Sequence, residues 1–199
     1  MEVPSRPTLP KLREAVQTCT ACELYRGATQ AVLGEGPAKA RAMLVGEQPG
    51  DREDIEGQPF VGPAGALLDR ALREAGIERK DVYVTNAVKH FRFRARGKRR
   101  IHQRPDREHV HACRPWLDAE LAIVKPDVLV CLGAVAAQSL LGNHVRVTKD
   151  RGRPIDSDLA GLVTVTVHPS SILRAGDERE EAYGEFVRDL ASVAERLRV

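Results

Sequence analysis

Four short runs of apolar, often β-branched residues recur along the chain, separated by segments with apolar residues at helical spacing. Such runs favour β-strands, and the segments between them favour amphipathic helices. The predicted strands are Ala42 to Val45, Val82 to Thr85, Val128 to Leu132 and Leu162 to Val167. The predicted helices are Pro63 to Ala75, Asp106 to Val124, Val135 to Leu141 and Glu181 to Leu197.

Strands that alternate with helices are typical of an α/β fold. The pattern predicts a three-layer α/β/α sandwich around a central, mainly parallel four-stranded sheet. No internal repeat or linker divides residues 1–199, so we expect a single domain. The motifs GEQPG, NAVKH, LGA and HPSS each follow one predicted strand. Because ligands bind outside the carboxyl ends of the strands in such sheets, the four motifs should converge on one cleft.

The composition, with 42% hydrophobic and 30% charged residues, is that of a globular protein rather than a disordered one. No apolar run approaches the roughly 20 residues that span a bilayer, and the first ten residues lack the apolar core of a signal peptide. We therefore expect a cytoplasmic protein, and nothing in the sequence indicates an oligomerisation surface. In a reducing compartment its four cysteines favour metal ligation or burial over disulfides.

Positive charge is concentrated in one segment, the basic loop of residues 89–105. It holds eight of the 31 Lys and Arg residues and no acid between Lys89 and Arg104, which leaves 23 basic residues against 28 acidic ones elsewhere. A run of this kind is often only a solvated surface or a targeting signal, but it also suits the phosphates of nucleic acid. Binding to nucleic acid should then weaken steeply as salt rises.

The first glycine-rich motif, GEQPG, leads into a longer polar stretch that ends at a predicted helix. It presents Glu47, Gln48 and Asp51, and then Phe60, whose ring is a candidate stacking platform for a base. A Gly/Pro turn that carries a solvated glutamate is the simpler alternative for the motif taken alone.

Two further strand ends carry polar side chains. Asn86 can offer a donor and an acceptor to the edge of a base, although asparagine is also a common turn residue. His168 stands beside the hydroxyls of Ser170 and Ser171, which with nearby backbone N–H groups suit a phosphate.

The motifs GEQPG, PFVGPAG, TNAVK, LGAVAA and HPSSILR, in this order and spacing, resemble those of the uracil-DNA glycosylase superfamily, in particular its iron–sulfur branch, family four. The resemblance runs from about Cys19 to Arg174. It implies an enzyme that flips a uracil nucleotide out of DNA, because the glycosidic carbon is inaccessible within the stack. The implied uracil-binding residues are Gln48, Asp51, Phe60 as the stacking ring and Asn86 as the reader of the base edge.

The resemblance also implies that His168 stabilises negative charge on the departing base. The residues that it implies for the DNA backbone are Lys98, Ser170, Ser171 and Arg174. The expected partner is uracil-containing DNA, with single strands preferred, and the expected process is base excision repair.

The spacing of Cys19 and Cys22 indicates a metal site, which Cys113 and Cys131 complete by simple counting. The iron–sulfur glycosylases, however, place their third cysteine at the position that His90 occupies here, and their fourth matches Cys113. The resemblance therefore implies a [4Fe–4S] cluster on Cys19, Cys22, His90 and Cys113, with Cys131 in the core. Ligand chemistry alone would also accept zinc.

Within the basic loop, the segment KRRIH resembles the insertion that marks the UdgX-type members of the superfamily, and His90 and the glutamine of GEQPG fit the same subgroup. This resemblance implies that His102 becomes covalently attached to the sugar after uracil leaves. It further implies Glu47 as the proton-accepting or orienting partner of His102, and Arg100 as the residue that holds the loop in place.

Capture by an imidazole is chemically plausible, because cleavage leaves cationic character at the sugar carbon and a neutral imidazole is a better nucleophile than water. The alternatives are a conventional glycosylase that turns over, with His102 only contacting a phosphate, and a non-catalytic, metal-containing nucleic-acid-binding module. The last alternative gives no role to Glu47, Asn86 and His168.

Overall fold

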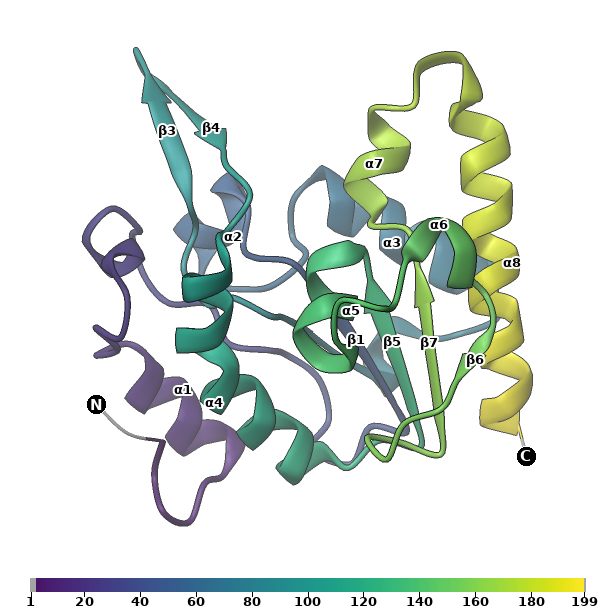
Figure 1. The fold of residues 1–199 in the computed structure, drawn as a ribbon, viewed down its shortest axis with the longest axis horizontal. Helices are drawn as coiled ribbons and strands as arrows, with labels where there is room; N and C mark the ends of the chain where they lie inside the picture. Colours follow the sequence, from purple (N-terminus) through teal and green to yellow (C-terminus); the bar gives the residue numbers. More distant parts are fainter. Residues whose placement is uncertain (1–2, 199) are drawn as a thin grey trace.

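The structure, a computed structural model, describes residues 3–198 and is built around a five-stranded sheet in the order β2-β1-β5-β7-β6 (Figure 1). The first four strands in this order are parallel, and β6 pairs antiparallel with β7 at one edge. These strands are β1 (Ala42–Gly46), β2 (Val82–Asn86), β5 (Val128–Leu132), β6 (Pro154–Ile155) and β7 (Leu162–Thr166).

Helices cover both faces of the sheet, which gives the three layers. The helices are α1 (Leu9–Val16), α2 (Asp51–Glu56), α3 (Pro63–Glu74), α4 (Arg107–Val124), α5 (Ala134–Leu141), α6 (Val147–Asp150), α7 (Pro169–Leu173) and α8 (Arg179–Arg198). Apolar residues of α3, α7 and α8 pack against one face, and those of α4 and α5 pack against the other. Short 3-10 turns cover Glu23–Arg26, Arg79–Asp81 and Gly176–Glu178.

The predicted α/β fold and its mainly parallel sheet are confirmed, but the predicted strand number of four is wrong. The fifth strand, β6, has two residues, one of them a proline, so it has no hydrophobic run that could predict it. Its place at the edge of the sheet is where a proline is tolerated. The four predicted strands and four predicted helices are all present with ends shifted by no more than about two residues, a normal uncertainty for element boundaries.

The basic loop is an antiparallel hairpin, which its charge gave no reason to predict. Strand β3 (Phe93–Arg96) pairs with β4 (Arg99–His102), and Gly97 adopts a φ of 58° in the turn between them. Figure 1 shows the hairpin standing above the carboxyl ends of the sheet strands. Among residues 3–198, no helix is long and apolar enough to cross a bilayer.

Candidate active site

The four strand-end motifs meet at a cavity of about 760 Å³, as the fold class predicts. The cavity lies between the loops after β1, β2, β5 and β7 and the end of the hairpin. The predicted site residues that line it are Glu47, Gln48, Asp51, Phe60, Asn86, His102, His168, Ser170 and Arg174. Lys98 in the hairpin turn, Arg100 and the exposed Ser171 are not part of its lining.

One wall of the cavity is made by Phe60 and Asn86, which are 7% and 2% exposed. The backbone of Phe60 has a φ of 58°, a left-handed conformation that is strained for an aromatic residue and is typical of functional sites. Gly46, at the end of β1, lets both side chains approach, because a Cβ there would lie 2.4 Å from Asn86 Oδ1 and 2.6 Å from the Phe60 ring. The two predicted uracil-binding residues are therefore next to each other.

The loop that carries Phe60 is anchored by Glu53, a residue that the sequence analysis did not single out. Its buried carboxylate accepts hydrogen bonds from the backbone N–H groups of Gly50 at 3.1 Å and Gly62 at 2.9 Å. Glu53 thereby ties the start of α2 to the residue that precedes α3. An acid three residues after a glycine that follows a strand is a helix-capping pattern, and that pattern was the available signal.

His168 faces Phe60 across the cavity, with 6.0 Å between the ring centroids and 30° between the planes. Its Nδ1 accepts a hydrogen bond from the backbone N–H of Ser170 at 3.2 Å and lies 2.8 Å from the Ser170 hydroxyl. Burial, together with smaller effects of the nearby His102 and Arg174, lowers the pKa of His168 to about 4. His168 is thus neutral near pH 7, with its proton on Nε2 available to donate to a ligand.

In this structure, Ser170 and Ser171 both contact His168. Ser170 orients the imidazole of His168, and Ser171 Oγ donates to the carbonyl oxygen of His168 at 2.7 Å. Their predicted contacts with the DNA backbone stay predictions.

Gln48 holds the hairpin to the sheet. Its Nε2 donates to the carbonyl oxygens of Arg92 at 3.1 Å and Gln103 at 3.0 Å, and its Oε1 accepts from the backbone N–H of Arg92 at 3.2 Å. These two residues flank the hairpin on either side, and Gln48 is only 6% exposed. Its amide therefore clamps the hairpin, and because Gln48 also lines the cavity, its predicted contact with uracil stays a prediction.

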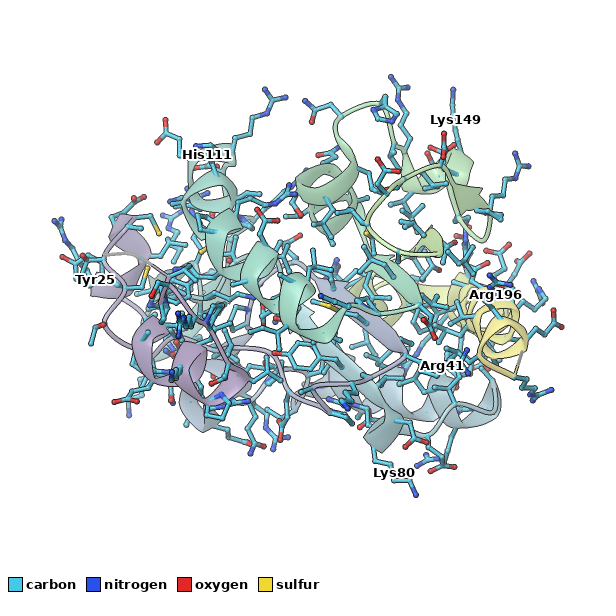
Figure 2. All side chains as sticks on the ribbon, turned by 90° about the horizontal axis from the view of Figure 1, so that it is seen from below. Tyr25, Arg41, Lys80, His111, Lys149 and Arg196 are labelled. Carbon is cyan, nitrogen blue, oxygen red and sulfur yellow. The ribbon has the colours of Figure 1, made fainter. Side chains whose placement is uncertain are left out.

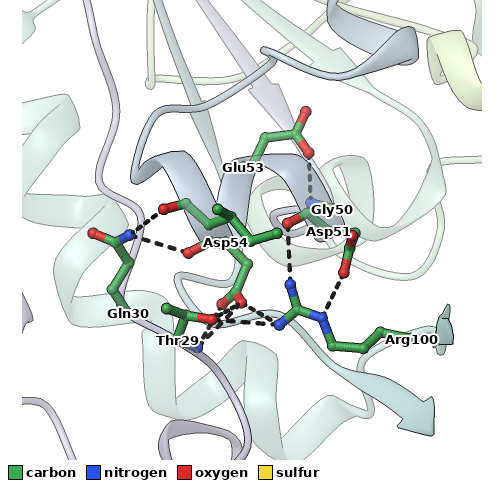
Figure 3. A network of polar contacts seen from close by, with 8 residues as sticks. Thr29, Gln30, Gly50, Asp51, Glu53, Asp54 and Arg100 are labelled. Carbon is green, nitrogen blue, oxygen red and sulfur yellow. Dashed lines mark hydrogen bonds and ion pairs between the residues drawn. The ribbon is translucent and has the colours of Figure 1, made fainter. Parts of the chain in front are cut away.

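Arg100 fastens the hairpin to α2, as Figure 3 shows. Its guanidinium lies 2.5 Å from a carboxylate oxygen of each of Asp51 and Asp54, and it also packs over the rings of Phe91 and Phe93. Asp54 is fully buried, so this pair is shielded from solvent. The geometry makes Arg100 a positioning residue, and Asp51, predicted to bind uracil, is occupied by the same ion pair.

His102 and Glu47 meet across the cavity, with His102 Nε2 3.4 Å from Glu47 Oε1. Glu47 Oε1 is buried and has no hydrogen-bond partner among residues 3–198. Burial raises the pKa of Glu47, against the opposing effect of Arg104 and Arg174, and burial lowers the pKa of His102. The site therefore favours a neutral imidazole beside a carboxylate that is poised to accept a proton.

A buried ion pair stabilises the end of β2. Lys89 Nζ lies 2.5 Å from Glu120 Oε2 and donates to the carbonyl oxygen of Asn86 at 2.7 Å and to Thr85 Oγ1 at 2.8 Å. Glu120 also accepts from the hydroxyl of Tyr83 at 2.9 Å. Both charged side chains are fully buried, so each depends on the other for compensation.

Replacing Glu120 by Gln leaves the Lys89 ammonium buried without its counter-charge. We expect the free energy of unfolding to fall by about 3 to 5 kcal/mol, the usual effect of breaking a buried pair from one side. Glu56→Gln, which breaks the exposed pair of Glu56 with Arg52, should cost less than about 1 kcal/mol. Urea denaturation of the two variants makes the comparison, and equal losses would contradict the assigned role of Glu120.

The predicted metal ligands are only partly brought together. Cys22 packs against the small cluster that contains Cys113, and the backbone N–H of Lys89 lies 3.4 Å from the Cys113 sulfur. Cys19 is buried in a neighbouring apolar cluster, and His90 is 4% exposed with a pKa lowered by burial. Within residues 3–198, no three His, Cys, Asp or Glu side chains are grouped to hold a metal ion.

The chemistry of the thiols nevertheless suits a metal cluster. The interaction with Cys113 lowers the pKa of Cys22 to about 6, whereas the same interaction and burial raise the pKa of Cys113, so one thiol of the pair is favoured as the thiolate that iron requires. Cys131 behaves differently, since it is fully buried in β5 among apolar neighbours and burial raises its pKa to about 12. Its predicted place in the core is confirmed.

Comparison with known proteins agrees with the geometry of this cavity. Residues 33–191 match the model of the family described as the uracil DNA glycosylase superfamily. The chain is 46% identical to the type-4 uracil-DNA glycosylase of Thermotoga maritima over 162 residues, 81% of each chain. It is 39% identical to the type-4 enzyme of Pyrobaculum aerophilum over 190 residues, 92% of this chain and 91% of that one. A type-5 enzyme of the same organism is 33% identical over 211 residues, 94% of this chain and 87% of that one. The chain therefore belongs to the uracil DNA glycosylase superfamily.

Proposed function

We propose that this protein is a uracil-DNA glycosylase, which cleaves the N-glycosidic bond of uracil in DNA and so begins base excision repair. The observation that carries the proposal is the convergence of Phe60, Asn86 and His168 on one cavity from segments that belong to or follow three different strands. Family membership and the printed names of the type-4 relatives support the same activity.

The residues of the cavity have different roles toward a flipped nucleotide. The ring of Phe60 stacks on the base, and the carboxamide of Asn86 forms hydrogen bonds with the edge of the base. A pyrimidine with a different pattern of donors and acceptors cannot form the same hydrogen bonds. As the glycosidic bond breaks, negative charge develops on the uracil. The neutral Nε2–H of His168 donates to that charge, and a donor aimed at developing charge lowers the barrier.

After uracil leaves, the sugar can react with water, which is conventional turnover, or with His102, which is covalent capture. The comparisons favour conventional turnover, because the relatives are described as type-4 uracil-DNA glycosylases. In that case Glu47 takes a proton from an attacking water molecule. The position of His102, 3.4 Å from Glu47 and in the lining of the same cavity, favours covalent capture as a second candidate.

In the capture step, the bond between C1′ of the sugar and N1 of uracil breaks, and its electron pair leaves on the uracil. An imidazole nitrogen of His102 donates its lone pair to form a new bond to C1′. The imidazole proton passes to Glu47 or to solvent. The product is a neutral N-glycoside, a poor leaving group, so one protein molecule would be consumed for each uracil.

A [4Fe–4S] cluster would be held by Cys19, Cys22, His90 and Cys113, a donor set of three thiolates and one imidazole. When bound, it supplies a structural cross-link. The chain's own contribution is to bring the N-terminal segment, the end of β2 and α4 together, since Cys22 already contacts Cys113. Broad visible absorption by the purified protein would support the cluster, and a colourless protein that contains zinc would contradict it.

Positive charge around the cavity gives the means to hold the DNA backbone. Arg104 and Arg174 line the cavity, and Arg94, Arg96, Lys98 and Arg99 are exposed on the hairpin. Each phosphate that these side chains neutralise adds salt-dependent affinity. The proposed substrate is uracil-containing DNA, preferably single-stranded, because no strand then has to be unpaired before flipping.

A denaturing gel tests the proposal and separates its two outcomes. The protein is incubated with a single-stranded oligonucleotide that contains one uracil, and a matched one that contains thymine. Turnover yields strands that alkali cleaves at the uracil position, and capture yields a slow, heat-stable band of protein joined to DNA. If neither product forms from the uracil strand, the glycosylase proposal fails.

The reaction should be insensitive to pH from about 8 down to 6.5. Both imidazoles are held neutral, because the pKa of His168 is about 4 and that of His102 is lowered from its usual 6.5. Acid therefore slows the reaction when the pH falls through the lowered pKa of His102, or through the raised pKa of Glu47, whose carboxylate must be ionised to accept a proton. A single-turnover rate profile tests this, and a half-maximal rate at or above pH 6.5 would contradict it.

A further inference from the structure

A second cavity, of about 260 Å³, lies beside the active site between the first half of α4 and α5. We call it the side groove. It is lined by four basic residues and by no carboxylate: Arg104, Arg107, His111 and Arg114. Arg104 also lines the active-site cavity, so the two cavities are neighbours that share one wall.

The positive charge of the side groove is only partly compensated. Arg114 pairs with Asp118 at 2.6 Å and donates to the carbonyl oxygen of Ser139, so it joins α4 to α5 as a structural wall. Within residues 3–198, Arg107 has no ion pair, and the guanidinium of Arg104 has no ion pair and one hydrogen bond, to the Gln138 side chain at 3.5 Å. Two guanidinium groups therefore remain free for an external anion.

The rest of the lining is suited to the apolar part of the same ligand. Val110, Val135 and Pro105 contribute to the groove, and Gln138, Ser139 and Asn143 add polar groups at its side. A nucleotide combines these features, since it joins a phosphate to a sugar and a base with large apolar faces. A free inorganic anion would use only the arginines.

We propose that the side groove binds the nucleotide adjacent to the uracil on the same strand, with its phosphate on Arg107 and Arg104. The inference rests on the proposed function, which puts the uracil nucleotide in the neighbouring cavity. A flipped nucleotide stays connected to the strand on both sides, so the backbone must leave the active site along a surface that compensates its charge. The shared residue Arg104 provides that continuity.

Charge reversal at Arg107 tests the proposal, because Arg107 lines the side groove and not the active-site cavity. Uracil release is measured under single-turnover conditions, with enzyme in excess over a single-stranded oligonucleotide. Arg107→Glu should raise the half-saturating enzyme concentration about tenfold or more, which is the effect of losing one charge-assisted contact. The maximal rate should fall by a smaller factor than this concentration rises. The salt dependence of binding should lose a slope of about 0.7, the value for one phosphate of a single strand.

Two variants serve as controls. Arg107→Lys keeps the charge and should stay close to the wild type. Arg196→Glu makes the same charge change near the end of α8, where an exposed arginine lies far from His111 and the groove, as Figure 2 shows. It should leave the half-saturating concentration within about twofold of the wild type, because screening removes distant charge effects.

Two shortened substrates locate the contact, one with the uracil nucleotide at the 5′ end and one with it at the 3′ end. On one of them, the wild type and Arg107→Glu should become equal, because no neighbouring nucleotide is left to enter the groove. An unchanged half-saturating concentration on the long strand, or a difference that persists on both short ones, would overturn the inference. If the wild-type protein releases no uracil from any substrate, it is the proposed function that fails.

Discussion

Replacing His168 by alanine should lower the single-turnover rate of uracil release by about 10² to 10³. The imidazole is held neutral by burial and is oriented through Nδ1 by Ser170, which leaves Nε2–H as the donor to the departing uracil. Loss of one such donor has an effect of this size in other enzymes that stabilise developing negative charge. The rate is measured with enzyme in excess, so that slow binding does not conceal the chemical step.

Ser171→Ala is the matched control, because within residues 3–198 the Ser171 hydroxyl hydrogen-bonds only to the backbone of His168 and lies on the exposed side of α7, and saturating enzyme offsets the loss of a contact with the DNA backbone. It should keep the rate within about threefold. Ser170→Ala, which removes the hydroxyl beside Nδ1 but keeps the backbone donor, should have an intermediate effect. Equal rates for His168→Ala and Ser171→Ala would show that His168 does not act on the leaving group.

The second large effect concerns the end product at the sugar. If the protein captures its substrate, His102→Ser should abolish the slow, heat-stable band on a denaturing gel while uracil is still released. Serine leaves space for water at the position of the imidazole, and Glu47 remains to accept a proton. The DNA should then carry an alkali-labile site in place of the protein.

Lys98→Ser is the control for this experiment, since Lys98 is exposed in the hairpin turn and lines no part of the active-site cavity. It should keep the covalent band. A band that persists with His102→Ser would identify another nucleophile. A wild-type protein that forms no band but releases several uracils per molecule is a conventional glycosylase, in which His102 has another role.

The sequence predicts the layers of this fold because its strands are buried on both faces. Strands β1 and β5 are continuous apolar runs, and β2 and β7 are rich in β-branched residues, so all four are visible without a structure. The hairpin is different, since β3 and β4 are largely exposed and rich in arginine. Their pairing depends on contacts made by Gln48 and Arg100 with distant parts of the chain, which no local pattern reveals.

The candidate site could be predicted where each side chain comes directly after a strand. Asn86 and His168 are of this kind, and their convergence follows from the parallel sheet. What could not be predicted is which polar groups are already satisfied within the protein. Gln48 and Asp51 have partners on or beside the hairpin, which residue type alone does not reveal, and their predicted contacts with uracil stay predictions.

The metal site also shows which features a sequence pattern predicts and which depend on tertiary contacts. The Cys19 and Cys22 spacing and the strand pattern around Cys131 were enough to separate a candidate ligand pair from a core residue. The contact between Cys22 and Cys113 follows from the packing of α4, which places the two thiols together across a large sequence separation. Such a contact is a tertiary feature, and the choice of Cys113 over Cys131 came from the resemblance.

The central claim, that this cavity removes uracil from DNA, is tested most directly by measuring the free base. Single-stranded DNA that contains one deoxyuridine is incubated with the protein, the strands are removed, and the released base is quantified by mass spectrometry. This readout is the same whether the sugar ends bonded to water or to His102. We predict release of uracil approaching one base per strand with enzyme in excess, and no thymine from the matched thymidine strand. No free uracil, with equal binding to both strands, would contradict the account.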